Sequence, residues 1–72
     1  MEEVYTTIGK KITQLRKESR PGWMSQADLA KKMKVTTNTV SRWETGTYKI
    51  QIHQLIKVAN IFKVGINEFF KL

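Results

Sequence analysis

The chain has 72 residues, with 13 Lys and Arg against 6 Asp and Glu, and carries a formal net charge of +7 at pH 7. This length suffices for one domain with a small core, and the absence of cysteine excludes disulfides, thiolate metal ligands and a cysteine nucleophile. One histidine and six carboxylates leave little material for a metal site or an acid–base pair. We therefore expect a binding domain without metal or cofactor, and not an enzyme.

We expect neither a membrane-spanning segment nor a signal peptide. No apolar run approaches the roughly 18 residues that a membrane-spanning helix requires. The chain starts Met1-Glu2-Glu3, which is acidic where a signal peptide is basic. We expect a cytoplasmic protein of a bacterial or phage-infected cell, associated with the nucleoid.

The excess positive charge lies in one stretch of the chain. Residues 10–49 hold ten basic and three acidic side chains, whereas the rest of the chain has a net charge of zero. Such a concentration favours a surface that faces a polyanion, although Lys-rich solvated helices explain the charge equally well. A membrane surface fits less well, because the basic helices lack a broad apolar face.

Hydrophobic periodicity predicts a series of short helices. The first spans about residues 4–18, where Ile8, Ile12 and Leu15 share one face, and Arg20-Pro21-Gly22 ends it. A second helix starts at Ser25, which stands three residues before an acidic side chain in the pattern of a capping box, and ends near residues 33–35.

Three further helices follow. The third begins at Thr36-Thr37, where a hydroxyl can cap it, and stops before Gly46. The fourth covers about residues 51–62 and shows the clearest period, with one apolar face formed by Ile52, Leu55, Ile56, Ala59 and Phe62. A short fifth helix, about residues 65–70, buries some of Ile66, Phe69 and Phe70. Because strand-type alternation is absent, the fold class is all-α.

The third helix has two chemically different sides. One side carries its two large apolar residues, Val40 and Trp43, together with Thr36 and Thr39. The other side has short hydrogen-bonding groups and one guanidinium, from Thr37, Asn38, Ser41, Arg42 and Thr45. These are mostly weak helix formers whose groups suit base edges: Asn pairs with adenine, Arg with guanine, and a Thr methyl packs on a thymine methyl. Alternatively, Thr and Asn stand there only because the helix starts there.

These residues resemble the helix-turn-helix domain of the Xre/Cro and phage-repressor family. The resemblance lies in Ser25–Ala30, Val35-Thr36 and Val40–Gly46, and continues through Leu55, Ala59 and residues 61–64 to Glu68-Phe69-Phe70. It covers about residues 8–70. It implies a five-helix DNA-binding domain whose second and third helices form the helix-turn-helix, with the third helix in the major groove.

The resemblance also implies roles for individual residues. Base contacts fall on Thr37, Asn38 and Arg42, with Ser41 beside them. Phosphate contacts fall on Gln26, Thr36, Thr45, Tyr48 and Lys49. A structural ion pair is expected between Arg16 and Glu44, and Trp43 is assigned to the core. Gln26 could instead be a merely exposed polar residue, and Tyr48 could pack under the fourth helix.

Three positions depart from the family pattern. Lys34 stands where the family usually has glycine or another residue tolerant of positive φ, and Ile50 replaces a common proline. The loop of residues 19–24 is longer and more aromatic than usual. We expect Trp23 in this loop to cover the core; if exposed, it would be a candidate contact for a protein partner.

The leading interpretation is a sequence-specific transcriptional regulator, repressor-like and from a phage or mobile element. It would bind a palindromic operator in double-stranded DNA as a weak homodimer or as a dimer formed on DNA, with contacts from Phe69, Phe70 and Leu72. The alternative is a protein-binding antirepressor or antitoxin on the same fold that captures a partner repressor or toxin. A catalytic triad of Ser25 or Ser41 with His53 and Asp28 can be written, but we regard that composition as accidental.

Overall fold

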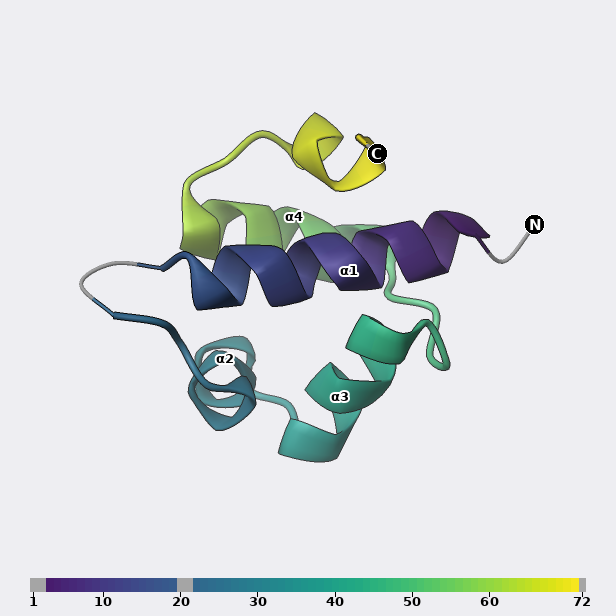
Figure 1. Cartoon of the computed structure of the whole chain (residues 1–72). Helices are drawn as coiled ribbons and strands as arrows, with labels where there is room; N and C mark the ends of the chain where they lie inside the picture. Colours follow the sequence, from purple (N-terminus) through teal and green to yellow (C-terminus); the bar gives the residue numbers. More distant parts are fainter. Residues whose placement is uncertain (1–2, 20–21, 72) are drawn as a thin grey trace.

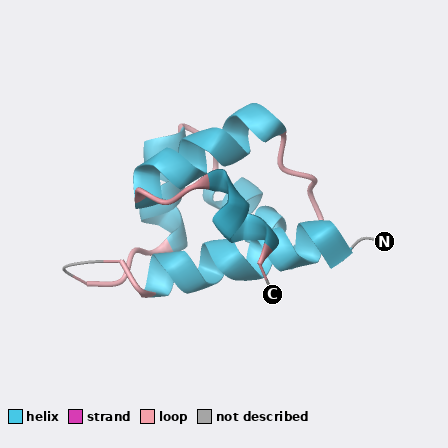
Figure 2. Cartoon of the chain, turned by 90° about the horizontal axis from the view of Figure 1, so that it is seen from above, coloured by secondary structure: helices cyan, strands magenta, loops and turns pink. Residues whose placement is uncertain are grey.

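A computed structural model of the chain describes residues 3–19 and 22–71. It contains four α-helices and one 3-10 helix, which are α1 (Glu3–Lys17), α2 (Gln26–Met33), α3 (Thr37–Thr45), α4 (Ile52–Phe62) and η1 (Ile66–Phe70). The long α1 runs through the middle of the molecule, with α2 and α3 on one side of it and α4 and η1 on the other (Figure 1). The described residues form helices and loops without a strand, so the all-α class is confirmed (Figure 2).

The boundaries of α2 and α3 follow from their capping residues. Ser25 Oγ accepts a hydrogen bond from Asp28 N at 3.0 Å, and Asp28 Oδ2 accepts one from Ser25 N at 3.2 Å, which completes the predicted capping box. Thr36 caps α3 through a single hydrogen bond, which its hydroxyl accepts from Thr39 N at 3.1 Å. Gly46 ends α3 in the left-handed conformation, with φ of 83°.

The turn between α2 and α3 places a lysine in a conformation that favours glycine. Lys34 has φ of 61° and ψ of 42°, and its N–H bonds to carbonyls of the last turn of α2. The left-handed conformation costs a residue with a Cβ about 1–2 kcal/mol. The turn therefore keeps the left-handed shape typical of glycine at this position and accepts strain to do so.

The expectation of five full helices is wrong. Residues Ile66–Phe70 form a single 3-10 helix, in which Glu68 N donates to Gly65 O at 3.0 Å. Five residues are too few for a run of bonds to the fourth preceding carbonyl, and 3-10 geometry is common in such short segments. The side chain of Phe69 is completely buried and anchors this turn against α1 and α4.

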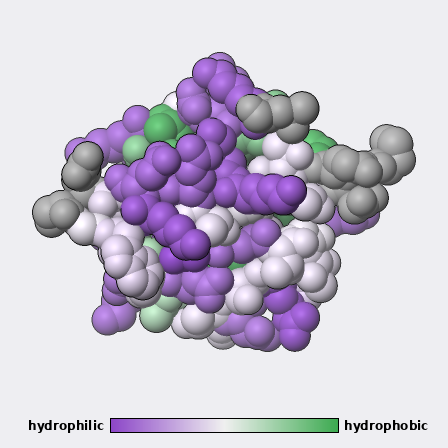
Figure 3. All heavy atoms as spheres, viewed as in Figure 1, coloured by the Kyte–Doolittle hydropathy of each residue, from purple (hydrophilic) through white to green (hydrophobic). Residues whose placement is uncertain are grey.

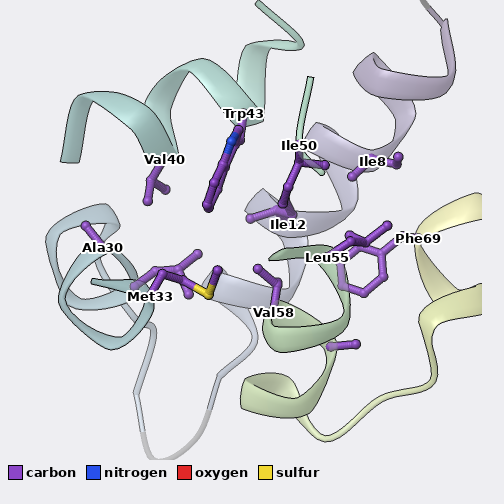
Figure 4. Close-up of a cluster of buried hydrophobic side chains, with 12 residues drawn as sticks. Ile8, Ile12, Ala30, Met33, Val40, Trp43, Ile50, Leu55, Val58 and Phe69 are labelled. Carbon is purple, nitrogen blue, oxygen red and sulfur yellow. The ribbon is translucent and has the colours of Figure 1, made fainter. Parts of the chain in front are cut away.

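The core is built around α1 and receives side chains from every other helix (Figure 4). Twelve buried hydrophobic residues form it: Ile8, Ile12, Leu29, Ala30, Met33, Val40, Trp43, Ile50, Leu55, Val58, Ala59 and Phe69. The Ile50 that stands in place of proline is therefore a core residue. No helix in the described part of the chain is long and apolar enough to cross a membrane.

The apolar face expected on α4 is only partly buried. The face of α4 that packs inward carries Leu55, Val58 and Ala59, whereas Ile52 and Ile56 remain 62% and 47% exposed. An apolar period shows that a helix has an inner face, but the neighbouring elements decide how wide that face is. Here α4 meets α2 and η1, and the flank with Ile52 and Ile56 is left uncovered.

Trp23 is also exposed, at 67%, although we expected it to cover the core. Its neighbour Met24 takes that position, packing against the core and donating its N–H to Arg16 O at 2.8 Å. Met24 therefore takes the place over the core, and Trp23 is left at the surface.

Candidate nucleic-acid interface

The orientation of α3 is set by two buried side chains and one very close backbone contact. Val40 is completely buried and Trp43 is 3% exposed, and both point into the core (Figure 4). A Cβ placed on Gly9 of α1 would lie 2.4 Å from Glu44 O and 2.5 Å from Trp43 O. Only glycine therefore lets α1 approach the end of α3 this closely. Sequence reasoning missed Gly9, although a glycine inside a helical period was a visible signal.

The opposite side of α3 faces outward with its polar groups. The side chains expected to contact bases lie on this face: Thr37, Asn38 and Arg42 are exposed and Ser41 is partly exposed. Glu44, the single carboxylate of α3, points inward instead, with its side chain only 6% exposed. The outer face of α3 therefore offers hydrogen-bond donors, acceptors and one positive charge, with no negative charge to repel a polyanion.

A buried hydrogen-bond network joins α1, α2 and α3 behind this face. Arg16 Nε donates to Glu44 Oε2 at 2.6 Å and Arg16 Nη2 donates to Glu44 Oε1 at 3.0 Å, so the expected pair is present as a two-pronged contact. The third donor, Arg16 Nη1, bonds to Met24 O at 2.9 Å. The Arg16 side chain is 7% exposed, so the guanidinium is taken out of water and its partners replace the lost hydration.

Gln26 is the fourth member of this network. Its Nε2 donates to Glu44 Oε1 at 2.9 Å, which links the first residue of α2 to the end of α3. Burial by itself raises the pKa of Glu44, but hydrogen bonds from Arg16 and Gln26 outweigh this effect and hold the pKa below its ordinary value of 4.5. Glu44 is therefore charged at neutral pH, and through Arg16 and Gln26 it connects α3 to α1 and α2. This use of the Gln26 amide was not foreseen from the sequence.

Two threonines assigned to phosphates also have local partners. Thr36 Oγ1 caps α3 and lies 2.9 Å from Thr39 Oγ1. Thr45 Oγ1 donates to Arg42 O at 3.2 Å and lies 2.8 Å from Thr47 Oγ1. Both hydroxyls are at the surface, and each stabilises an end of α3. Thr36 Oγ1 keeps one position for a further hydrogen bond. Thr45 Oγ1 also accepts from Thr47 N at 3.4 Å, so its donor and both acceptor positions are engaged, and a phosphate contact would replace one of these bonds.

The loop after α3 carries two exposed side chains of the predicted interface. Tyr48 is 46% exposed and does not pack under α4; its ring centre lies 5.4 Å from Cζ of Arg42. Lys49 is exposed, with its Nζ 5.8 Å from the centre of the Tyr5 ring. The loop therefore adds an aromatic ring and a positive charge beside the last turn of α3.

Among the residues that the structure describes, no three His, Asp or Glu side chains gather as they would around a metal ion. The face seen in Figure 3 is mostly hydrophilic, with hydrophobic atoms in small separate areas. A depression of about 410 Å³ is lined by residues of α1 and α4 and adjoining loop residues, away from the outer face of α3.

Comparison with known proteins identifies a family for the chain. The family model described as Helix-turn-helix matches residues 24–69, which include α2, α3, α4 and most of η1. No curated protein and no solved structure matches the chain.

Proposed function

The chain belongs to the Xre/Cro-type helix-turn-helix family, a family of DNA-binding transcriptional regulators, and from this premise we propose that it inserts α3 into the major groove of an operator. The observation that carries the proposal is the outer face of α3. Its polar side chains stand free of the core while Glu44 is turned inward onto Arg16. The outer face of α3 therefore presents no carboxylate to repel a phosphate backbone.

Base recognition in this proposal comes from α3. Asn38 offers an amide that pairs with adenine through one donor and one acceptor, and Arg42 offers a guanidinium fork that suits guanine. Thr37 and Ser41 add short groups that fit a thymine methyl or a single hydrogen bond. All four lie on the outer face, and none is buried.

Phosphate contacts flank this helix and set its position in the groove. Gln26 and Thr36 stand at the N-termini of α2 and α3, where free backbone N–H groups favour an anion. Thr45, Tyr48 and Lys49 lie at the other end of α3. Such contacts add affinity for any duplex without reading its sequence.

Operator binding as a dimer is part of the proposal, since one short helix makes few base contacts. The supporting feature is the uncovered flank of Val4, Ile52, Ile56 and Phe70, four large hydrophobic side chains between 43% and 62% exposed. These residues lie in the parts of the chain that have no net charge, so two copies can meet there with little repulsion. Phe69 does not contribute as expected, because it is fully buried in the core, and Leu72 lies outside the described residues.

A second candidate function is the capture of a partner protein, in the manner of an antirepressor or antitoxin. The observation that favours it is the exposed Trp23, which with Lys17 borders an open hollow of about 240 Å³. Large exposed aromatic side chains are common anchors of protein interfaces. Size-exclusion chromatography with the product of the neighbouring gene, using the wild-type chain and Trp23→Ala, separates this candidate from DNA binding.

The experiment that tests DNA binding is selection of bound sequences from random duplexes, followed by titration of duplexes changed at single base pairs. Asn38→Ala and Arg42→Ala should each relax preference at one base pair, by about 1–3 kcal/mol. Gln26→Ala should weaken binding to all duplexes about equally. Lys57→Ala, a matched loss of charge on α4, serves as the control and should leave the preference unchanged. Failure to enrich any sequence would contradict the proposal.

A further inference from the structure

The ring of Tyr48 lies beside the guanidinium of Arg42, the one positive charge on the outer face of α3. The distance from Arg42 Cζ to the ring centre is 5.4 Å, within the range in which a cation and an aromatic face attract each other. Both side chains are exposed, so burial does not force them together. The contact has to be explained by the backbone that brings the two residues to one place.

That backbone is fixed by several hydrogen bonds. Gly46 takes the left-handed conformation and reverses the chain, and Tyr48 N then donates to Arg42 O at 3.1 Å. The same carbonyl accepts a hydrogen bond from Thr45 Oγ1, and Thr47 N donates to that hydroxyl at 3.4 Å. The turn therefore returns the chain onto the last turn of α3 and holds the Tyr48 Cα close to Arg42.

An aromatic partner, unlike a carboxylate, leaves the N–H donors of an arginine free for other hydrogen bonds. A carboxylate beside Arg42 would occupy the N–H groups that form the fork, as Glu44 occupies those of Arg16. The ion pairs given for the side chains that the structure describes do not include Arg42. An aromatic ring attracts the cation through its π face and does not accept hydrogen bonds from the fork as a carboxylate does. The five donors of Arg42 stay available while its side chain is restrained.

We propose that Tyr48 is a positioning residue, whose ring holds the Arg42 guanidinium in the orientation in which it reads a base pair. This inference rests on the proposed function of α3 and adds to it a role in specificity for a loop residue that was assigned to the phosphate backbone. A long arginine side chain loses rotamer freedom when it binds, and a restraint already present in the free protein lowers that cost for the correct base. The effect is confined to the base pair that Arg42 contacts.

The test compares Tyr48→Leu, which removes the ring, with Tyr48→Phe, which removes only the hydroxyl. The probes are four duplexes that carry the selected sequence and differ only at the base pair to which Arg42→Ala becomes indifferent. Tyr48→Leu should reduce the preference at this base pair about two- to fivefold, as expected for loss of an exposed cation–π contact. Tyr48→Phe should keep the preference, whatever its hydroxyl adds to the affinity for all four duplexes. Combining Tyr48→Leu with Arg42→Ala should give no further loss.

A second measurement on the free protein makes the inference independent of DNA binding. The NMR order parameter of the Arg42 Nε–H bond should fall in Tyr48→Leu and stay at the wild-type value in Tyr48→Phe, with circular dichroism confirming that both variants are folded. An order parameter that does not fall in Tyr48→Leu would overturn the inference, even if the protein binds its operator well. Equal loss of affinity for all four duplexes in both variants would overturn it too and leave Tyr48 as a phosphate contact. A wild-type chain that prefers no duplex would refute the proposed function, while the order parameter would still decide whether the ring restrains Arg42.

Discussion

Replacement of Glu44 by alanine would leave the buried guanidinium of Arg16 with one remaining partner, the carbonyl of Met24 at 2.9 Å. The substitution removes the hydrogen bonds of 2.6 and 3.0 Å that the carboxylate accepts from Arg16. It also leaves Gln26 Nε2 without its acceptor. Because the Arg16 side chain is only 7% exposed, water cannot easily replace these bonds.

The expected loss is large on the scale of this protein. Removing one member of a buried ion pair costs about 3–5 kcal/mol, and the surviving bond to Met24 places Glu44→Ala near the lower value, about 3 kcal/mol. A chain of 72 residues has a total free energy of unfolding of about 4–11 kcal/mol. The variant should therefore lose a substantial part of its stability, or unfold at ordinary temperature if the wild type is near the lower limit.

Urea unfolding followed by circular dichroism measures this loss. With a slope of about 1 kcal/mol per molar urea, the midpoint should fall by about 3 M. The matched control is the double variant Arg16→Met/Glu44→Met, which replaces both charges by apolar side chains and should be more stable than Glu44→Ala. A loss below about 1 kcal/mol in Glu44→Ala, or a double variant that is the less stable of the two, would refute the reasoning from a desolvated arginine.

The same carboxylate predicts a pH dependence of stability. Its pKa in the folded protein lies below the ordinary value of 4.5, so the charged form is favoured by folding. Its contribution to stability is fully present above pH 4.5 and is lost as the pH falls through the lower folded pKa. Wild-type stability should therefore drop more steeply below pH 4.5 than that of Glu44→Gln. Parallel pH profiles for the two proteins would contradict this assignment.

Three further predictions follow from backbone geometry and charge. Gly9→Ala should destabilise the fold by about 1–3 kcal/mol, because the new Cβ would lie 2.4 Å from Glu44 O. The control Gly22→Ala, whose Cβ would have nothing within 4 Å, should change stability little. Equal urea midpoints for the two variants would contradict the close approach of α1 to α3. Lys34→Gly should increase the free energy of unfolding by up to about 1 kcal/mol, because it relieves a residue held at φ of 61°. The thermal midpoint should rise accordingly, and a lower midpoint would show that the turn is not strained. Operator affinity should fall steeply with salt, with a log–log slope of about −0.9 for each phosphate contacted, and a salt-independent affinity would argue against phosphate contacts altogether.

Local signals in the sequence determined where α2 and α3 begin and where α3 ends. Ser25 and Thr36 cap α2 and α3 where expected, and Gly46 ends α3. Each of these signals acts between residues within one helical turn. Residues that close in the sequence are also close in the fold, whatever the other helices do. The inward position of Val40 and Trp43, and with it the identity of the outer face of α3, also followed from helical periodicity alone.

What only the tertiary structure decided depends on which elements pack together. The exposure of Ile52 and Trp23 could not be read from periodicity, because an apolar side chain is buried only where a neighbouring element covers it. The amide of Gln26 on Glu44 and the ring of Tyr48 on Arg42 join different elements, and their geometry is set when the helices dock. The sequence by itself determined the starts of α2 and α3, the end of α3 and the outer face of α3, through contacts within single turns. The docking of α1, α2 and α3 against one another, which only the tertiary structure decided, controls the orientation of the groups on that face.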